Sequence, residues 1–219
     1  MDLEQELLSL IAHRLRHHLT KAKTATNFAL AALSENDVIT AQADMQQVKE
    51  DVSGALEAVY DVIALAEMGS TFEPSTLFSV SALFAKTIPE CVRIIQPADR
   101  TCSIDLTDSD IRLRGTPKAL TAALLKMTSI FLQLNQAESV SISTELSDGI
   151  MTLTLQGVEQ CETGPTRTLN LLLNRLDTSS LIELLGCVRV VHANHGKIEI
   201  LVKDEPGSCL IQVKVIFSL

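Results

Sequence analysis

Three histidines stand close together near the start of the chain, at positions His13, His17 and His18. If this segment is helical, each residue turns the side-chain direction by about 100°. His13 and His17 then point away from the apolar side of the helix, whereas His18 falls on that side. An exposed imidazole with a free ring nitrogen is a nucleophile that can accept a phosphoryl group. His13 meets the geometric requirement for such a nucleophile, and His17 lies beside it, one helical turn on.

The sequence is compatible with other interpretations of these histidines. His13 and His17 are four residues apart, a spacing that suits a pair of metal ligands. No carboxylate or third ligand accompanies them on that face, so no metal site is expected. A solvated helix face without a chemical task is the alternative for His13, and a packed position between helices is expected for His18.

Charge is distributed unevenly around His13. The whole chain has a formal net charge of −9, yet no acidic residue occurs from position 7 to position 34. Arg14, Arg16, Lys21 and Lys23 lie around the His13 face. Such a cationic surface would attract and orient an acidic, phosphorylated partner. Charged residues on any exposed helix face are the alternative explanation.

The elements that must position His13 are two long helices within residues 3–67. Apolar residues recur at alternating steps of three and four, the pattern of helices packed side by side. The two runs are Leu8, Ile11, Leu15, His18, Ala22, Ala25, Ala29 and Ala32, then Ala41, Met45, Val48, Val52, Ala55, Val59, Val62 and Ala66. Turn and N-cap residues at 34–37 separate them. An antiparallel hairpin is expected, and pairing two hairpins would give a dimeric four-helix bundle. Alternatively, the helices cover a domain within the same chain.

The pattern changes after Gly69, where helices and alternating strands follow one another. Helices are expected at 77–95, 117–134 and 180–194, and strands at 103–106, 111–114, 140–145, 151–156, 197–202 and 210–217. Residues 72–74 are expected to form a linker or short strand. Helices interspersed with antiparallel strand pairs indicate an α+β sandwich. We therefore expect a hairpin domain at 1–69 and a sandwich domain at 70–219.

Motifs in both segments are similar to the core of the sensor histidine kinases. His13-Arg14-Leu15-Arg16-His17-His18-Leu19-Thr20 resembles the kinase H-box, His-acid-Leu-Arg-x-Pro-Leu-Thr. Residues 190–199, followed by Glu205-Pro206-Gly207, resemble the end of the kinase ATP-binding domain, and Gly115-Thr116-Pro117 resembles the start of its nucleotide helix. The resemblance implies a histidine-kinase ATPase-like sandwich after the hairpin.

The nucleotide chemistry of that family does not carry over to this chain. Lys126 and Ile130 stand where the family has asparagines, one of which coordinates Mg²⁺. An aliphatic side chain cannot bind a cation that requires oxygen ligands. The strand at 153–156 runs into Gly157-Val158-Glu159-Gln160 where the family has Asp-x-Gly-x-Gly, and 178–181 lacks the second glycine-rich stretch. Arg14 replaces the acid that follows the phosphorylated histidine.

The resemblance therefore implies a dimeric histidine phosphotransferase of the ChpT type, which relays phosphoryl groups between response-regulator receiver domains. It needs no cofactor of its own, because the receiver supplies Mg²⁺. His13 would be the phospho-acceptor, and Arg14, Arg16, His17, Thr20 and Lys21 would support it or contact the partner. A pseudokinase adaptor that only binds a kinase or receiver is one alternative, and a kinase with unusual ATP contacts is another.

Composition indicates which partners and which cellular location to expect for this chain. An acidic chain with a sequence pI near 5.0 is unsuited to binding nucleic acid or anionic membranes. No run reaches the roughly 18–20 apolar residues of a membrane span. Five scattered cysteines without a Cys-x-x-Cys pair are typical of reduced thiols. A cytoplasmic protein is expected.

Overall fold

The computed structural model describes residues 3–68, 75–95, 100–107, 111–160, 168–205 and 208–218. Six helices in these ranges are α1 (Leu3–Ser34), α2 (Val38–Met68), α3 (Val80–Ile95), α4 (Pro117–Leu134), α5 (Thr168–Arg175) and α6 (Thr178–Ala193). Seven strands are β1 (Thr76–Ser79), β2 (Thr101–Asp105), β3 (Arg112–Gly115), β4 (Ser139–Ser147), β5 (Ile150–Gln160), β6 (Gly196–Glu205) and β7 (Ser208–Ser218). The predicted domain boundary at 69/70 and the segment 72–74 lie outside the described residues.

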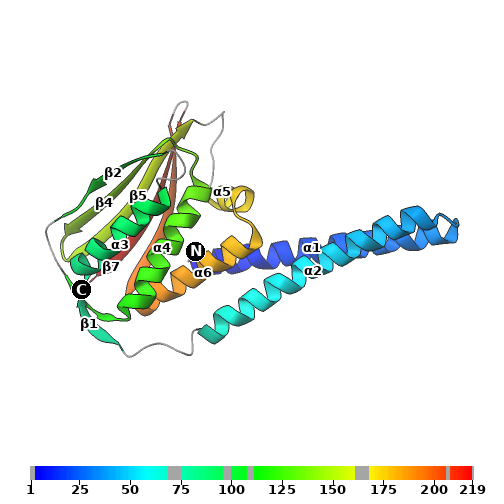
Figure 1. Ribbon diagram of the computed structural model, residues 1–219, viewed down its shortest axis with the longest axis horizontal. Helices are drawn as coiled ribbons and strands as arrows, with labels where there is room; N and C mark the ends of the chain where they lie inside the picture. Colours follow the sequence, from blue (N-terminus) through cyan, green and yellow to red (C-terminus); the bar gives the residue numbers. More distant parts are fainter. Residues whose placement is uncertain are drawn as a thin grey trace.

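Helices α1 and α2 form the expected antiparallel hairpin, which projects from the rest of the molecule (Figure 1). The turn lies where sequence predicted it. Asn36 adopts a left-handed backbone conformation with φ of 60°. The Asp37 carboxylate then accepts hydrogen bonds from the Thr40 backbone amide at 3.1 Å and the Thr40 hydroxyl at 2.6 Å. These bonds satisfy donors at the start of α2, as an N-cap does.

The buried residues of α1 form two groups along its length. Toward the turn it consists of small residues, Ala22, Ala25, Ala29 and Ala32, as the heptad pattern predicted. At the base it consists of Leu7, Leu10 and Ile11, which join the core of the sandwich and pack near α6. Leu8 was expected on the seam, but 40% of it is exposed. The prediction was wrong because the base of α1 packs against a domain as well as against α2.

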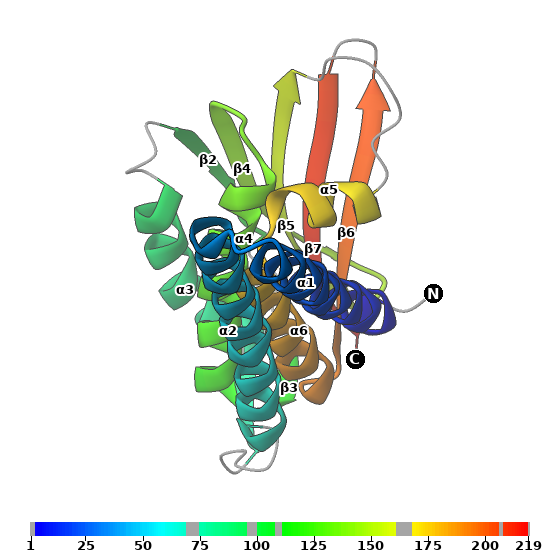
Figure 2. The same cartoon turned by 90° about the vertical axis from the view of Figure 1, so that its right-hand side faces the viewer.

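A five-stranded sheet in the order β2-β4-β5-β7-β6 forms one layer of the sandwich. Strands β2 and β4 are parallel, and the other neighbours are antiparallel. Helices α3, α4 and α6 cover one face of this sheet (Figure 2). Alternate residues of β7 point into that layer, from Cys209 to Phe217. The predicted α+β sandwich is therefore confirmed.

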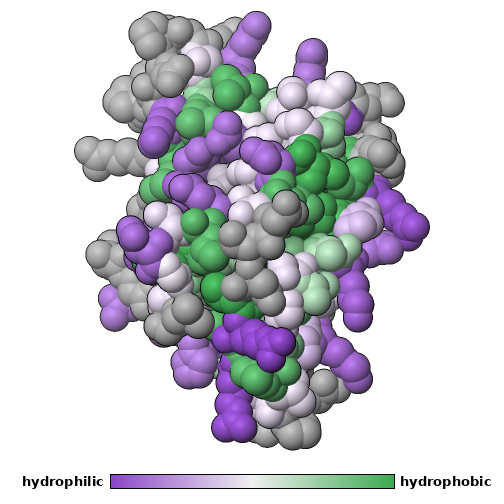
Figure 3. Space-filling model, turned by 90° about the vertical axis from the view of Figure 1, so that its left-hand side faces the viewer, coloured by the Kyte–Doolittle hydropathy of each residue, from purple (hydrophilic) through white to green (hydrophobic). Residues whose placement is uncertain are grey.

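None of the described helices covers the other face of the sheet (Figure 2). Hydrophilic and hydrophobic residues are interspersed on the side of the molecule opposite the hairpin (Figure 3). Half-buried polar side chains such as Thr152, Thr154 and Lys214 occupy the outward positions of β5 and β7, and the Gln212 amide donates to Gln156 at 2.6 Å. Among the described helices none is long and apolar enough to cross a lipid bilayer.

Two elements differ from the sequence expectation. The helix expected at 77–95 begins only at Val80, because Thr76–Ser79 pairs with β3 as a short antiparallel strand. Helix α5 was not predicted at all. It has eight residues, too few for a clear helical period, and it lies just before α6.

A close approach between β5 and the end of α4 gives a first prediction. A Cβ atom at Gly157 would lie 1.9 Å from the side-chain nitrogen of Asn135, which is fully buried. We expect Gly157→Ala to lower the free energy of unfolding by about 1–3 kcal/mol, measured by urea denaturation. Gly54→Ala is the matched control, because its Cβ would meet only ordinary contacts with His18 at 3.5 Å. That helix substitution should instead stabilise the protein by about 0.5–1 kcal/mol, and equal effects of the two would contradict the assignment.

Candidate functional site

His13 lies exposed on α1, near the point where the hairpin leaves the sandwich. Arg16, His17, Thr20 and Lys21 are exposed as well. At about 100° per residue, all four point within about 80° of the His13 direction. These residues therefore form one basic, histidine-bearing surface on α1, which we call the His13 face.

Arg14 points away from this face and into the protein. It is half-buried, and its Nη2 donates to the backbone carbonyl of Leu173 at 2.6 Å and to that of Leu176. The structure thus places Arg14 in a contact within the chain, between α1 and the end of α5. The sequence predicts a role for Arg14 in supporting His13 or contacting a partner, because a charged residue on a long helix is usually directed to solvent.

His18 packs between the two helices of the hairpin. Its ring lies over Gly54 of α2, and its Nδ1 is 3.5 Å from a carboxylate oxygen of the buried Asp51. The second oxygen of Asp51 accepts a hydrogen bond from the Gln47 side chain at 3.2 Å. The ring nitrogen facing Asp51 is buried without a hydrogen bond, so His18 belongs to the packing of the hairpin rather than to the His13 face.

The junction between α5 and α6 holds a negative charge close to Arg14. Asp177 caps α6, and its carboxylate accepts from the Ser180 backbone amide at 2.7 Å. The amide and hydroxyl of Ser180, with a smaller contribution from the Arg14 charge, hold the pKa of Asp177 below its usual value. Arg14 therefore lies among two carbonyls and a carboxylate.

The lowered pKa gives a second prediction. Asparagine caps helices as well as aspartate but carries no charge, so Asp177→Asn should lose only the charge-dependent stability, about 0.3–1 kcal/mol for an exposed carboxylate. Because the folded pKa is depressed, wild type should be more stable than the variant at pH 7. The difference should disappear as the pH falls through the folded-state pKa, which lies below the usual value of an aspartate. Thermal unfolding from pH 7 to pH 3 measures this, and a difference independent of pH would contradict the electrostatic explanation.

Lys126 and Ile130 of α4, which stand where the resembled family has asparagines, make contacts within this protein. The Lys126 ammonium pairs with the Glu183 carboxylate of α6 at 2.5 Å. Ile130 is fully buried in the core. Neither side chain offers a free oxygen ligand, so this part of α4 does not fit a Mg²⁺–nucleotide.

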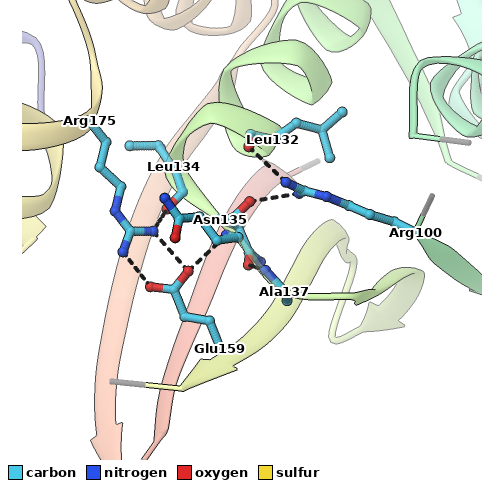
Figure 4. Close-up of polar contacts among 8 residues, drawn as sticks. Arg100, Leu132, Leu134, Asn135, Ala137, Glu159 and Arg175 are labelled. Atoms are coloured by element: carbon cyan, nitrogen blue, oxygen red, sulfur yellow. Dashed lines mark hydrogen bonds and ion pairs between the residues drawn. The ribbon is translucent and has the colours of Figure 1, made fainter. Parts of the chain in front are cut away.

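The end of β5 carries a buried ion pair where the family has its glycine-rich loop. Arg175 of α5 binds the Glu159 carboxylate through both terminal nitrogens, at 2.8 and 2.6 Å, and donates to the Leu134 carbonyl at 2.5 Å (Figure 4). The Gln136 backbone amide also donates to Glu159 at 2.8 Å. From the other side, Arg100 donates to the carbonyl of Asn135, which caps α4, at 2.6 Å and to that of Leu132 at 3.5 Å. Arginine side chains therefore donate to the carbonyls at this end of α4, whereas the buried Nδ2 of Asn135 has no hydrogen-bond partner.

The pairing of Glu159 with Arg175 is not predicted from the sequence. One signal was available, because Glu159 occupies the inward position of β5, in phase with Met151, Leu153 and Leu155. A carboxylate at such a position requires a buried partner. The identity of that partner depends on α5, which the sequence did not predict.

The described residues contain no group of three or more side chains that would hold a metal ion. The cysteines in the described ranges form no disulfide with one another. Burial raises the pKa of Cys187 to about 12, so it stays protonated and unreactive at neutral pH. Cys161 lies outside the described residues.

No protein-family model matches the sequence, and no curated protein sequence matches it. Solved structures do match the fold. The histidine kinase ThkA in complex with the response regulator TrrA aligns with 97% of this chain and 61% of its own, at 12% identity and a TM-score of 0.51. The Acinetobacter baumannii histidine kinase AdeS aligns with 91% of this chain and 96% of its own, at 14% identity and a TM-score of 0.49. The likeness to ThkA shows that this chain has the fold of a histidine kinase core, a helical hairpin followed by an ATPase-like α/β sandwich.

Proposed function

We propose that this chain is a histidine phosphotransferase, which accepts a phosphoryl group on His13 from one receiver domain and passes it to another. The observation that carries the proposal is the exposed His13 on the hairpin of a histidine-kinase fold, within an H-box-like segment. The His13 face adds Arg16 and Lys21, whose charges suit an acidic, phosphorylated partner. The response regulator bound to ThkA supports a receiver as the class of partner.

In the proposed step a ring nitrogen of His13 attacks the phosphorus of a receiver phospho-aspartate in line. The N–P bond forms as the P–O bond to the aspartate breaks, and the electron pair of that bond returns to the carboxylate. Mg²⁺ held by the receiver offsets charge on the transferred oxygens. The reverse step donates the phosphoryl group to the aspartate of a second receiver. The chain contributes mainly the position of His13 and the charge around it.

ATP is not the phosphoryl donor in this proposal. Lys126 is paired with Glu183, Ile130 is buried, and the end of β5 is filled by Glu159 and Arg175. Arg14 replaces the acid of the kinase H-box, and a guanidinium cannot take a proton at neutral pH. These contacts do not fit nucleotide binding or autophosphorylation.

A homodimer completes the proposal. Large apolar side chains remain exposed along both helices of the hairpin, among them Leu19, Phe28, Leu30, Leu56 and Ile63. A second hairpin would cover them in a four-helix bundle. The proposed setting is the cytoplasm, where receiver domains act. One chain has a mass of 23.8 kDa, and sedimentation equilibrium at micromolar concentrations should give twice that mass.

The proposal is tested by incubating the purified chain with a receiver domain carrying a radiolabelled phosphoryl group. The label should move to this chain and should be labile in acid but stable in alkali, as phosphohistidine is. A titration with a non-hydrolysable ATP analogue and Mg²⁺ accompanies it and should give no binding below millimolar concentrations. Micromolar affinity for the analogue would favour a working kinase.

The competing function is a pseudokinase adaptor that binds a kinase or receiver without transfer. Arg14 stands directly after His13 in place of the H-box acid and cannot take up a proton at neutral pH. This loss favours the adaptor. Stable complex formation with a phosphorylated receiver but no label on this chain would overturn the phosphotransferase and leave the adaptor.

A further inference from the structure

Helix α5 is held to the sandwich on one side by a buried ion pair. Arg175, in its last turn, binds Glu159 of β5 and the Leu134 carbonyl at the end of α4 (Figure 4). Only 6% of the Glu159 side chain and 25% of the Arg175 side chain are exposed. An ion pair with this many hydrogen bonds in a buried position fixes the direction of the short helix relative to the sheet.

On the other side, the same turn of α5 is held by the hairpin. The last carbonyls of any α-helix lack partners within the helix. In α5 the carbonyl of Leu173 and that of the following Leu176 accept from the Arg14 guanidinium, which comes from a helix more than 150 positions earlier in the sequence. The Asp177 carboxylate adds negative charge beside them. A cation is favoured at this helix C-terminus.

We propose that α5 is a strut between the sheet and the hairpin, and that Arg14 is the positioning residue that joins the strut to α1. The chain of contacts runs from Glu159 through Arg175 and the end of α5 to Arg14, which is the neighbour of His13. The strut holds the helix that carries His13 in one arrangement beside the sandwich. In this respect Arg14 has a structural task in place of the acid–base task of the H-box acid.

Other contacts between α1 and the sandwich explain why the strut can be tested without unfolding the protein. Arg189 of α6 pairs with Glu4 at 2.9 Å, and Leu7, Leu10 and Ile11 lie in the shared core. These contacts hold the first three turns of α1. Removal of the half-buried Arg14 side chain should therefore free the end of α5 while the chain stays folded.

The experiment is hydrogen exchange by mass spectrometry on the free protein, read on the backbone amides of residues 168–176. In Arg14→Ala these amides should exchange about tenfold faster or more, because the local opening of α5 no longer breaks charge-assisted hydrogen bonds. Arg14→Lys should recover part of the protection, since an ammonium keeps the charge but not the fork of donors. Arg16→Ala, an arginine of the exposed His13 face, is the matched control and should leave α5 unchanged.

A double-mutant cycle distinguishes a strut from two independent contacts. Arg14 and Glu159 act on opposite sides of α5, so the strut predicts coupling through it. Once Glu159→Gln has loosened α5, adding Arg14→Ala should increase its exchange by much less than tenfold. Unchanged exchange of α5 in Arg14→Ala, or fold-changes that simply multiply in the double variant, would overturn the proposal. Because exchange is read without a partner or phosphoryl donor, failure of phosphotransfer would not affect this result.

Discussion

Replacing His13 with glutamine should abolish transfer of label from a phosphorylated receiver to this chain. Glutamine is similar in size and polarity, but its amide nitrogen has no lone pair available to attack phosphorus. The loss should be complete within detection, since removal of a nucleophile eliminates the covalent step itself. The measurement is the time course of acid-labile label on wild type and His13→Gln at equal receiver concentration.

Two controls make this result specific. His13 is exposed, so His13→Gln should change the free energy of unfolding by no more than about 0.5 kcal/mol. His17→Gln removes the other exposed imidazole, one helical turn away on the same face. It should slow transfer by less than about tenfold, because His17 assists and does not react. Transfer of label to His13→Gln, or its loss only in His17→Gln, would move the acceptor to another residue.

The features of the fold that sequence predicted are those set by local patterns. The hairpin turn follows from capping and turn residues at 34–37, which act over a few positions. Helix α4 begins and ends where Gly115-Thr116-Pro117 and its apolar period predicted. The sheet strands follow from alternation of apolar and polar residues, and their order agrees with an α+β sandwich. The exposure of His13 follows from the rotation of about 100° per residue in a helix.

What sequence did not predict depends on contacts between distant segments. Leu8 matches the heptad step as well as Leu7 does, and only the packing of the α1 base near α6 decides between them. Arg14 looks like a solvent-facing cation until α5 provides carbonyls for it. The Glu159–Arg175 pair likewise requires a helix with too few residues to produce a period. These polar contacts join elements whose relative placement no local pattern encodes.

The largest effect on stability should come from Glu159→Gln. Glutamine keeps one oxygen to accept from the Gln136 amide, but it leaves the Arg175 guanidinium without its counter-charge in a mostly buried position. Breaking a buried ion pair by removing one partner costs about 3–5 kcal/mol. Arg175 keeps the Leu134 carbonyl and is partly exposed, so we expect a loss of about 2–3 kcal/mol. Thermal unfolding should show a decrease in Tm of roughly 5–10 °C for a chain of this size.

Glu145→Gln is the matched control, because Glu145 is an exposed carboxylate on the neighbouring strand β4. Its substitution should change stability by no more than about 0.5 kcal/mol. Arg175→Met should destabilise by a similar amount to Glu159→Gln, and the double variant should cost less than the two single effects together, since neither charge is then left unpaired. Equal stability of Glu159→Gln and Glu145→Gln would mean that the end of α4 is held by Arg100 and the apolar core alone, and that α5 needs no ion pair to keep its place.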